Sequence, residues 1–593
     1  MSNRPRPPRR PADLLTAMMS RQLRLEPKCN KITIDRGVRV PMRDGAILLA
    51  DHFAPVGTGV RPTVLMRCPY GRGWQFAMLA RPLAERGYHV LLQSARGTFG
   101  SGGRFTPGAD EAADGQDTVA WLRTQSWFDG RLAAAGPSYL AYAAWALALD
   151  PPPELAAMAV YISPHDLAAA GFGQGAFELY NLLSWSDLMA HQERHSAPVM
   201  IWRTITADKR LARIMNRLPI AATAAEVIAE GAPWYAEWLE HQDSRDPYWA
   251  GYSAAPALER STVPTLLISG FHDWFVEQTT QQYQALRQRG VPARLVIGPW
   301  THMTLDMGVA IRETLAWLDA IFDGNEAAAG PVPSVRAWCS GANQWHDLEQ
   351  WPPAEALPQT WYLRASGGLA AEGATAGVPG VAPRASTAST GDAGETTFRY
   401  DPADPAPAAG GRTLSMRNSG SQDNTAVEAR ADVLTFSTEP LERAVRVAGV
   451  PVVRLHLTSD SEHHDIFARL CDVDEDGKSG NLTDQIMRSV PGEAAAGQAR
   501  ELTITLTNVS HVFLPGHRIR LQVTGGAHPR FARNLGTGAD PITGTATAVV
   551  THRVHHDAER PSALMLPVVA ADPQAAATAA EAGAQVTTAA GQA

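Results

Sequence analysis

Cysteine is scarce in this sequence. The 593 residues include only four cysteines, and no two of them form a CxxC pair: Cys29, Cys68, Cys339 and Cys471. This excludes a disulfide-dense scaffold and a zinc site built on cysteines. Long apolar runs are absent as well, because no stretch approaches the ~18 consecutive apolar residues of a membrane-spanning helix.

Basic charge is not in excess either. The chain has 52 lysines and arginines against 60 aspartates and glutamates, so its net charge is −8. A nucleic-acid-binding protein is expected to present a basic face, and we therefore predict no nucleic-acid partner. Hydrophobic residues make up 45% of the chain and charged residues 19%, which is typical of a globular rather than a disordered protein.

The two ends differ in composition from the rest. Residues 1–30 are basic, but the apolar stretch within them is short and is soon interrupted by Arg21 and Arg24. We interpret this segment as a disordered tail rather than a signal peptide, and we expect a cytoplasmic protein without membrane contact. Residues 567–593 are rich in alanine without a core pattern, and we predict a second disordered tail there.

Residues 31–149 and 246–330 are predicted to form one α/β domain. Short apolar runs alternate there with stretches of helical spacing, which implies a parallel sheet covered by helices on both faces. The predicted strands are 62–70, 88–97, 131–136, 262–270 and 293–300, and the predicted helices are 76–87, 110–125, 139–149 and 279–290.

The other two segments have different patterns. Strand periodicity nearly stops over residues 150–245, and helices are predicted at 177–192, 206–218 and 223–231, so we interpret this segment as a helical insertion in the α/β domain. Short alternating strands separated by turns follow over residues 331–566, which is typical of a β-sandwich.

Ser138 is the candidate nucleophile. A buried strand ends at Gly136, Ser138 follows, and a helix begins at once. This strand–turn–helix pattern is typical of a nucleophile elbow, in which the helix N-terminus supplies backbone N–H groups and a positive dipole end. The full G-x-S-x-G motif is not met, because Leu140 stands in place of the last glycine. Taken alone, the pattern also fits a serine that caps a helix.

Two later residues favour the catalytic interpretation. Asp273 and His302 each follow directly after an apolar strand, where open sheets place their active sites. An α/β-hydrolase uses Ser, Asp and His in this chain order. The serine needs a base to take its proton, and the base needs a buried carboxylate to fix its tautomer. We therefore predict a Ser138–His302–Asp273 triad.

A tetrahedral intermediate would also need hydrogen-bond donors for its oxyanion. We expect one to be the backbone N–H of Tyr139, the residue after the nucleophile. The other should come from the turn after strand 62–70, where the hydroxyl of Tyr70 is a suitable donor. A packing role for Tyr70 is the alternative.

Several motifs together resemble one known family. GPSYLA, RCPYGR, RGTFGSGG, SGFHDWF, IGPWTH and the early MRDGAILLADHFAP are similar to the cocaine-esterase-like (CocE/NonD-type) hydrolases of the X-prolyl dipeptidyl-peptidase (S15) superfamily. Segments 398–407 and 529–538 resemble that family's C-terminal domain. The resemblance implies an α/β-hydrolase fold, an inserted helical cap over the site and a C-terminal jelly-roll β-sandwich. It also implies hydrolysis through an acyl-enzyme, with Ser138, Asp273, His302 and Tyr70 in the roles given above.

Metal-binding signals are weak. Residues 472–477 match the opening of an EF-hand loop, but Thr483 stands where the bidentate carboxylate is needed. The adjacent histidine pairs at 463–464 and 555–556 lie in strand-like context, where neighbouring side chains face opposite ways. We expect no metal and no organic cofactor.

We therefore predict a serine hydrolase that cleaves small acyl esters or amides. The expected pocket residues are Trp185, Trp202, Trp274, Phe275 and Leu140. An X-Pro dipeptidyl-peptidase or an α-amino ester hydrolase is the nearest alternative, but each must bind a substrate ammonium with carboxylates, and only Glu277 is acidic just after Asp273. An inactive binding protein that uses the sandwich is the alternative of another class. The sequence leaves open whether the chain forms a homo-oligomer.

Overall fold

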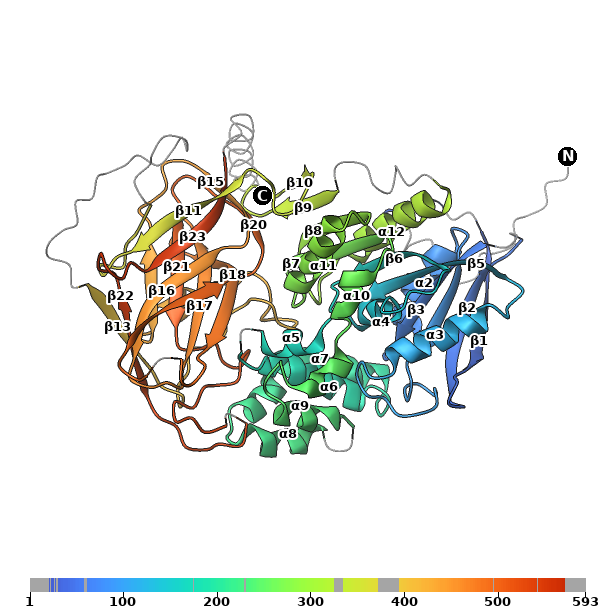
Figure 1. Cartoon of the computed structure of the whole chain (residues 1–593), viewed down its shortest axis with the longest axis horizontal. Helices are drawn as coiled ribbons and strands as arrows, with labels where there is room; N and C mark the ends of the chain where they lie inside the picture. Colours follow the sequence, from blue (N-terminus) through green and yellow to red (C-terminus); the bar gives the residue numbers. More distant parts are fainter. Residues whose placement is uncertain are drawn as a thin grey trace.

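The computed structural model describes residues 21, 23–25, 27, 30–57, 61–173, 175–228, 231–324, 334–371, 394–493, 495–540 and 542–570. Most of the predicted tail at 1–30 lies outside these residues, and so do residues 571–593 of the tail predicted at 567–593. Residues 567–569 are not part of a tail, because they pair with a neighbouring strand of the C-terminal sandwich. Within them, the chain forms a mixed α/β domain, a group of helices below it and a β-sandwich beside both (Figure 1).

A ten-stranded sheet forms the centre of the α/β domain. Its strand order is β1-β2-β4-β3-β5-β6-β7-β8-β9-β10, and the run from β4 to β9 is parallel. The edge strands β1, β2 and β10 pair antiparallel. The strands are β1 (Ile32–Pro41), β2 (Ile47–Pro55), β3 (Arg61–Cys68), β4 (His89–Ser94), β5 (Phe128–Pro137), β6 (Leu155–Tyr161), β7 (Thr265–His272), β8 (Ala293–Thr301), β9 (Val335–Cys339) and β10 (Gln344–Leu348).

Helices cover both faces of this sheet, as the apolar strands predicted. On β5, Leu132 and Ala134 belong to one buried cluster and Ala133 and Ala135 to another, because successive side chains of a strand point to opposite faces. The first cluster receives α3 (Glu111–Leu122), α4 (Tyr139–Leu147) and α11 (Val276–Gln288), and the second receives α2 (Trp74–Ala84) and α12 (Met307–Phe322).

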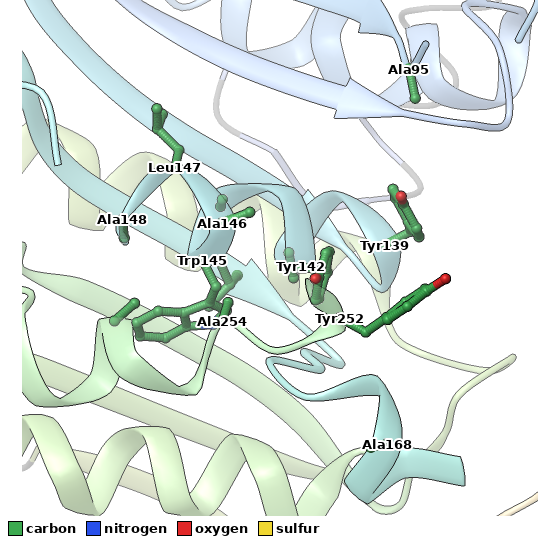
Figure 2. Close-up of a cluster of buried hydrophobic side chains, with 14 of the residues drawn as sticks. Ala95, Tyr139, Tyr142, Trp145, Ala146, Leu147, Ala148, Ala168, Tyr252 and Ala254 are labelled. Carbon is green, nitrogen blue, oxygen red and sulfur yellow. The ribbon is translucent and has the colours of Figure 1, made fainter. Parts of the chain in front are cut away.

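Helix α4 is buried along its whole length. Tyr139, Tyr142 and Trp145 from α4 lie in the same apolar cluster as Tyr252 and Ala254, which the chain brings from the far end of the helical insertion (Figure 2). The apolar surface that these side chains remove from water holds the helix, and with it the residue that precedes the helix, in one place.

The helical insertion begins later than predicted. Residues 155–161 form β6, a fully paired strand of the central sheet, although the sequence analysis assigned them to the insertion. The strand reads LAAMAVY, and its many alanines hide the strand periodicity because only Val160 is β-branched. The insertion contains α5 (Leu167–Phe172), α6 (Leu179–His191), α7 (Ala197–Met215), α8 (Ile220–Ile228) and α9 (Trp234–Glu240), followed by η1 (Pro247–Tyr252) and α10 (Ala255–Arg260).

The C-terminal part is a sandwich of two antiparallel sheets, as predicted. The larger sheet contains β11 (Ala356–Leu363), β12 (Leu369–Ala371), β13 (Glu395–Tyr400), β15 (Val445–Gly449), β16 (Val452–Ser459), β19 (Ala499–Thr505), β20 (Val509–Phe513), β22 (Val550–His555) and β23 (Ala563–Val569). The smaller has the order β14 (Val433–Ser437), β21 (Arg518–Thr524), β17 (Asp465–Val473) and β18 (Ser479–Arg488). A short helix, α14 (Thr425–Glu428), precedes β14.

The sheet of the α/β domain extends past the boundary that the sequence analysis placed at residue 330. β9 pairs with β8 in parallel, and β10 pairs with β9, so residues 335–348 complete the first sheet. The sandwich core begins only with β11, whose Trp361 and Leu363 face inward. β9 alternates buried side chains (Val335, Ala337 and Cys339) with half-buried ones, as a sandwich strand does, so its sequence pattern alone fits either sheet. β10 has no buried residue and no such alternation.

Candidate active site

Ser138 lies in a sharp turn between β5 and α4. Its backbone has φ 56° and ψ −120°, a conformation that costs energy for a residue with a side chain. Gly136, two residues earlier, has φ 143°, and a Cβ atom there would lie 2.5 Å from the Cβ of Leu140. The glycine is therefore needed for the close approach of the helix, and this strained strand–turn–helix is the geometry that projects a serine hydroxyl away from its sheet.

Asp273 and His302 meet Ser138 at the carboxyl ends of β7 and β8. The Nε2 atom of His302 lies 3.1 Å from Ser138 Oγ, and its Nδ1 atom lies 2.7 Å from Asp273 Oδ1. Because an ionised carboxylate can only accept, Nδ1 carries the proton and Nε2 is free to accept the proton of the serine. Ser269 Oγ donates to the other oxygen, Asp273 Oδ2, over 2.8 Å, and the Asp273 side chain is fully buried.

Tyr70 lies beside the serine. Trp185 Nε1 donates to the Tyr70 hydroxyl oxygen over 3.0 Å, so the phenolic proton is left to point elsewhere. Burial raises the pKa of Tyr70 to about 12, although hydrogen bonds with Trp185 and Ser138 act in the opposite direction. The hydroxyl is therefore a protonated donor at neutral pH.

The backbone N–H of Tyr139 is the second donor near the serine. It is the first N–H of α4, and the first four N–H groups of a helix have no partner within the helix. The side chain of Tyr139 is anchored separately, because its hydroxyl oxygen accepts from the backbone N–H of Gly108 over 2.9 Å. The anchor fixes the amide at the turn while leaving it available to a ligand.

A mostly apolar pocket opens at Ser138 and His302. It contains about 570 Å³ of space, part of it open to solvent. Three of the predicted pocket residues, Trp185, Trp274 and Phe275, line it. The other described lining residues are Tyr70, Tyr139, Pro164, Leu167, Ala170, Leu182, Trp238, Trp249 and Leu414.

Two predicted pocket residues lie elsewhere. Trp202 is 59% exposed, because the side of α7 that faces α6 is occupied by Arg203 and Arg210, both bound to Asp187. Leu140 is buried against Gly136 behind the turn and does not reach the pocket. Both predictions were wrong, since residue type alone did not tell which way a helical side chain points.

Most of the aromatic and aliphatic lining was not predicted from the sequence. Leu182 could have been predicted from its spacing, because it precedes Trp185 by three residues and so lies on the same face of α6. Leu414 gave no signal. It comes from the sandwich, between β13 and β14, and only the three-dimensional structure brings it to the pocket.

Carboxylate groups are absent from the described lining of this pocket. Glu277, the acidic residue nearest in sequence to Asp273, accepts from Arg412 Nη1 over 3.1 Å and from Gln485 Nε2 over 3.3 Å. Its carboxylate is therefore already paired with a cation.

The residues that gave weak metal-binding signals in the sequence form hydrogen bonds within the protein. Asp474 accepts the backbone N–H groups of Asp476 and Lys478, which closes the turn between β17 and β18. His555 pairs with Thr458 and His556 with Thr396. In the part of the chain that the structure describes, no three His, Cys, Asp or Glu side chains come together as metal ligands, and no helix has the length and apolar character needed to cross a membrane.

Comparison with known proteins places this chain in a family. A model of the X-Pro dipeptidyl-peptidase (S15 family) matches residues 44–304, and a model of the X-Pro dipeptidyl-peptidase C-terminal non-catalytic domain matches residues 327–565. A cocaine esterase from Rhodococcus sp. is 33% identical over 577 residues, which cover 91% of this chain and 99% of that protein. The chain belongs to the S15 family. The expected serine hydrolase class is confirmed by this membership.

Solved structures share the fold of this S15 chain over most of its length. An aminopeptidase from a Thaumarchaeota archaeon of marine sediment has a TM-score of 0.76 at 24% identity, covering 96% of this chain and 99% of its own. An α-amino acid ester hydrolase has a TM-score of 0.74 at 24% identity, covering 92% and 98%. A CocE/NonD family hydrolase from Staphylococcus aureus has a TM-score of 0.66 at 15% identity, covering 91% and 94%. The predicted α/β-hydrolase fold with a C-terminal β-sandwich is confirmed.

Proposed function

We propose that this S15 hydrolase cleaves esters of small, neutral acids through a Ser138–His302–Asp273 triad. The observation that carries the proposal is the continuous hydrogen-bond chain from Ser138 Oγ through His302 to Asp273 at the floor of an apolar pocket. This chain contains the nucleophile, the base and the orienting carboxylate that acyl transfer needs.

The first half of the reaction forms an acyl-enzyme. Ser138 Oγ attacks the ester carbonyl carbon while His302 Nε2 takes the serine proton. The carbonyl π electrons move to the oxygen, where the Tyr139 N–H and the Tyr70 hydroxyl stabilise the negative charge. The intermediate then expels the alcohol, whose oxygen receives the proton from His302.

The second half releases the acid. Water enters where the alcohol has left, gives a proton to His302 Nε2 and attacks the acyl carbon. The second tetrahedral intermediate uses the same two donors. Its collapse breaks the bond to Ser138 Oγ, which takes the proton back from His302, so the free enzyme is regenerated.

The pocket supports a neutral, apolar acyl group. Trp185, Trp274 and Phe275 provide aromatic walls, and apolar surface of this kind binds by removing hydrocarbon from water. The relative from Rhodococcus sp. carries the name cocaine esterase, which also supports ester cleavage. Amides of the same acids are the second substrate class that this chemistry allows.

Aminopeptidase or α-amino ester hydrolase activity is the alternative. Two of the structures that share this fold carry such names. A substrate ammonium taken out of water needs a carboxylate partner, because an unpaired buried charge is costly. Glu277 already accepts from Arg412 over 3.1 Å. Because this carboxylate is paired with a cation of the protein, the site favours neutral substrates.

A matched pair of substrates tests this proposal. The p-nitrophenyl esters of 3-phenylpropanoic acid and of phenylalanine differ only by the α-ammonium group. We expect kcat/KM to be at least about 100-fold higher for the neutral ester, because none of the described residues that line the pocket has a carboxylate for the ammonium. The reverse preference would support the alternative, and absence of turnover on both esters would support the inactive binding protein.

A further inference from the structure

One wall of the pocket is provided by the sandwich domain. Residues 408–420, here called the Leu414 loop, run between β13 and β14, and the backbones of Gly411 and Gly420 hydrogen-bond to each other in both directions, at 2.8 Å and 2.9 Å. Leu414 lies at the pocket together with Leu182 and Trp185 of α6. The substrate cavity is therefore enclosed between parts of the chain that are far apart in sequence.

Asn181 joins the two sides of this boundary. It is a fully buried residue of α6, and its Oδ1 atom accepts from the backbone N–H of Leu414 over 2.9 Å. Its Nδ2 atom donates to the backbone oxygen of Arg412 over 3.1 Å. The Asn181 amide thus makes one hydrogen bond to each of the two residues that flank Thr413, as an acceptor to one and a donor to the other. A neighbouring β-strand would pair with the loop backbone in the same way.

The orientation of the Asn181 amide is itself fixed. Glu178 Oε2 accepts from Asn181 Nδ2 over 3.1 Å, so the nitrogen is held toward the carboxylate. Arg530 Nη2 lies 3.4 Å from the other oxygen of Glu178, and its Nη1 donates to Asp484 Oδ1 over 2.6 Å. Glu178, Arg530 and Asp484 are all buried, and leaving one of them without its partners would be costly.

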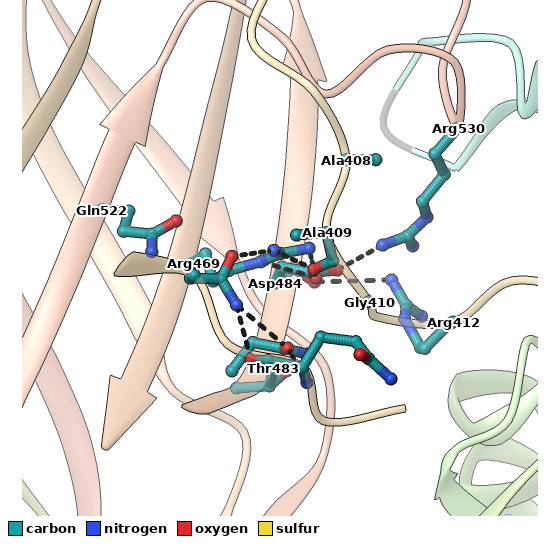
Figure 3. Close-up of polar contacts among 12 residues, drawn as sticks. Ala408, Ala409, Gly410, Arg412, Arg469, Thr483, Asp484, Gln522 and Arg530 are labelled. Atoms are coloured by element: carbon teal, nitrogen blue, oxygen red, sulfur yellow. Dashed lines mark hydrogen bonds and ion pairs between the residues drawn. The ribbon is translucent and has the colours of Figure 1, made fainter. Parts of the chain in front are cut away.

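Asp484 also fixes the start of the loop. Its Oδ2 atom accepts from Arg469 Nη2 over 2.8 Å, and Arg469 in turn donates to the backbone oxygen of Ala409. Figure 3 shows Arg412, Arg469 and Arg530 directed at Asp484. Burial would raise the pKa of Asp484, but the three guanidinium groups hold it well below its usual range. The Leu414 loop is thus tied down at Ala409, Arg412 and Leu414.

We propose that Asn181 is a positioning residue that sets the size of the acyl group the pocket accepts, by fixing how far Leu414 stands from the opposite wall. The proposal rests on the ester hydrolase function proposed above. Asn181 does not line the pocket, so it acts through Leu414 rather than on the substrate. Apolar pockets are sensitive to such shifts, since one methylene group of fit changes kcat/KM by roughly 10–200-fold.

The test compares p-nitrophenyl octanoate with p-nitrophenyl butyrate, using the ratio of their kcat/KM values in the full-length protein. Leu414→Ala should raise this ratio about tenfold by opening the wall. Asn181→Leu, which keeps the number and branching of the side-chain non-hydrogen atoms but removes both hydrogen bonds to the Leu414 loop, should raise this ratio by about threefold or more. The double variant should show the ratio of Leu414→Ala alone, because the two residues act on one wall.

Asn508 offers a matched control. It is a buried asparagine that also joins the sandwich to the α/β domain, since it accepts from Trp351 Nε1 over 2.7 Å and donates to Thr280 Oγ1 over 2.9 Å, but it lies away from the pocket. Asn508→Leu should lower the thermal midpoint much as Asn181→Leu does. It should leave the substrate ratio within about twofold of wild type.

Two results would overturn the proposal. The first is a folded Asn181→Leu variant whose ratio of kcat/KM values for octanoate and butyrate equals that of wild type. The second is a double variant whose change in this ratio is the product of the changes in the two single variants. Asn181→Ala, which removes the amide without adding a charge beside Glu178, serves in place of Asn181→Leu if that variant does not fold. Hydrogen exchange at the Leu414 amide should also be about tenfold faster in either Asn181 variant. This readout needs no turnover, so it separates failure of the positioning role from failure of the ester hydrolase function.

Discussion

The indole of Trp185 donates a hydrogen bond to the hydroxyl oxygen of Tyr70 over 3.0 Å. Trp185 comes from the helical insertion and Tyr70 from the turn after β3, so the insertion determines which way the phenol directs its proton. With the indole on one side of the oxygen, the phenolic proton is available for Ser138 and for a substrate oxygen next to it.

Tyr70→Phe tests the role of that proton. The substitution keeps the ring and removes only the donor, so we expect kcat to fall by about 10²–10³-fold, equivalent to ~2.7–4 kcal/mol of transition-state stabilisation. KM should change little when chemistry limits turnover. Steady-state and pre-steady-state kinetics on a p-nitrophenyl ester measure both values. A kcat within about threefold of wild type would mean that Tyr70 only packs against the pocket.

Ser138→Ala should lower ester hydrolysis by at least about 10³-fold while the fold is kept. A fluorophosphonate probe should label wild-type protein at Ser138 and leave the variant unlabelled, as read by peptide mass spectrometry. Labelling of a different serine in active protein would contradict the assignment of the nucleophile.

Asp273→Asn should lower kcat by about 10⁴-fold, because an amide in place of the carboxylate favours the wrong tautomer of His302. Ser269→Ala is the matched control. It removes the 2.8 Å hydrogen bond to Asp273 Oδ2 but leaves the carboxylate in place, so kcat should fall by no more than about tenfold. Equal losses in the two variants would show that the site is disturbed as a whole.

Chelation should leave the activity unchanged. The proposed steps use only Ser138, His302, Asp273 and the two oxyanion donors, so incubation with EDTA followed by desalting should give the initial rate of untreated enzyme. Loss of activity that added Zn²⁺ or Ca²⁺ restores would mean that a metal takes part after all.

Acid should destabilise the fold through buried histidines. Burial lowers the pKa of His552 to about 3, well below the ~6.5 of an exposed histidine. The unfolded chain therefore binds a proton at this position that the folded chain does not bind. The contribution of the neutral histidine to the free energy of unfolding is fully present above pH ~6.5. It is lost as the pH falls toward 3, by about 1.4 kcal/mol per pH unit for each such group.

The variant His552→Gln removes one of these groups. Thermal midpoints measured at several values between pH 7 and pH 4 should therefore fall less steeply with acid than in wild type. An unchanged slope would mean that the pKa of His552 is the same in the folded and the unfolded chain.

Local patterns explain what could be predicted from the sequence. The turn at Ser138 needs Gly136 before it and an apolar helix after it, and each of these lies within a few residues. Asp273 and His302 were found for a similar reason, because each follows directly after an apolar strand. Their catalytic roles stay a prediction, but the structure brings all three side chains within hydrogen-bond distance.

Long-range relationships explain what could not be predicted. β6 is a strand because β5 and β7 pair with it, although its alanine-rich sequence has little strand preference of its own. Trp202 was placed in the pocket from its residue type, whereas the packing of α7 on α6 turns it outward. Leu414 reaches the pocket only through contacts with a helix more than 200 positions earlier in the chain.

The contact between Glu178 and Arg530 spans 352 positions of the chain, and this has a consequence for synthesis. At ~5–20 residues per second, a ribosome makes Arg530 roughly 20–70 s after Glu178. From the synthesis of His302 to the end of that interval, the nascent chain has Ser138, Asp273 and His302. The arginine that holds Glu178, and through it Asn181, is still to be made. The finished pocket is therefore a product of the last part of translation. A chain that stops before β21 would leave the ribosome with Ser138 but without the arginine that fixes the Leu414 side of the pocket.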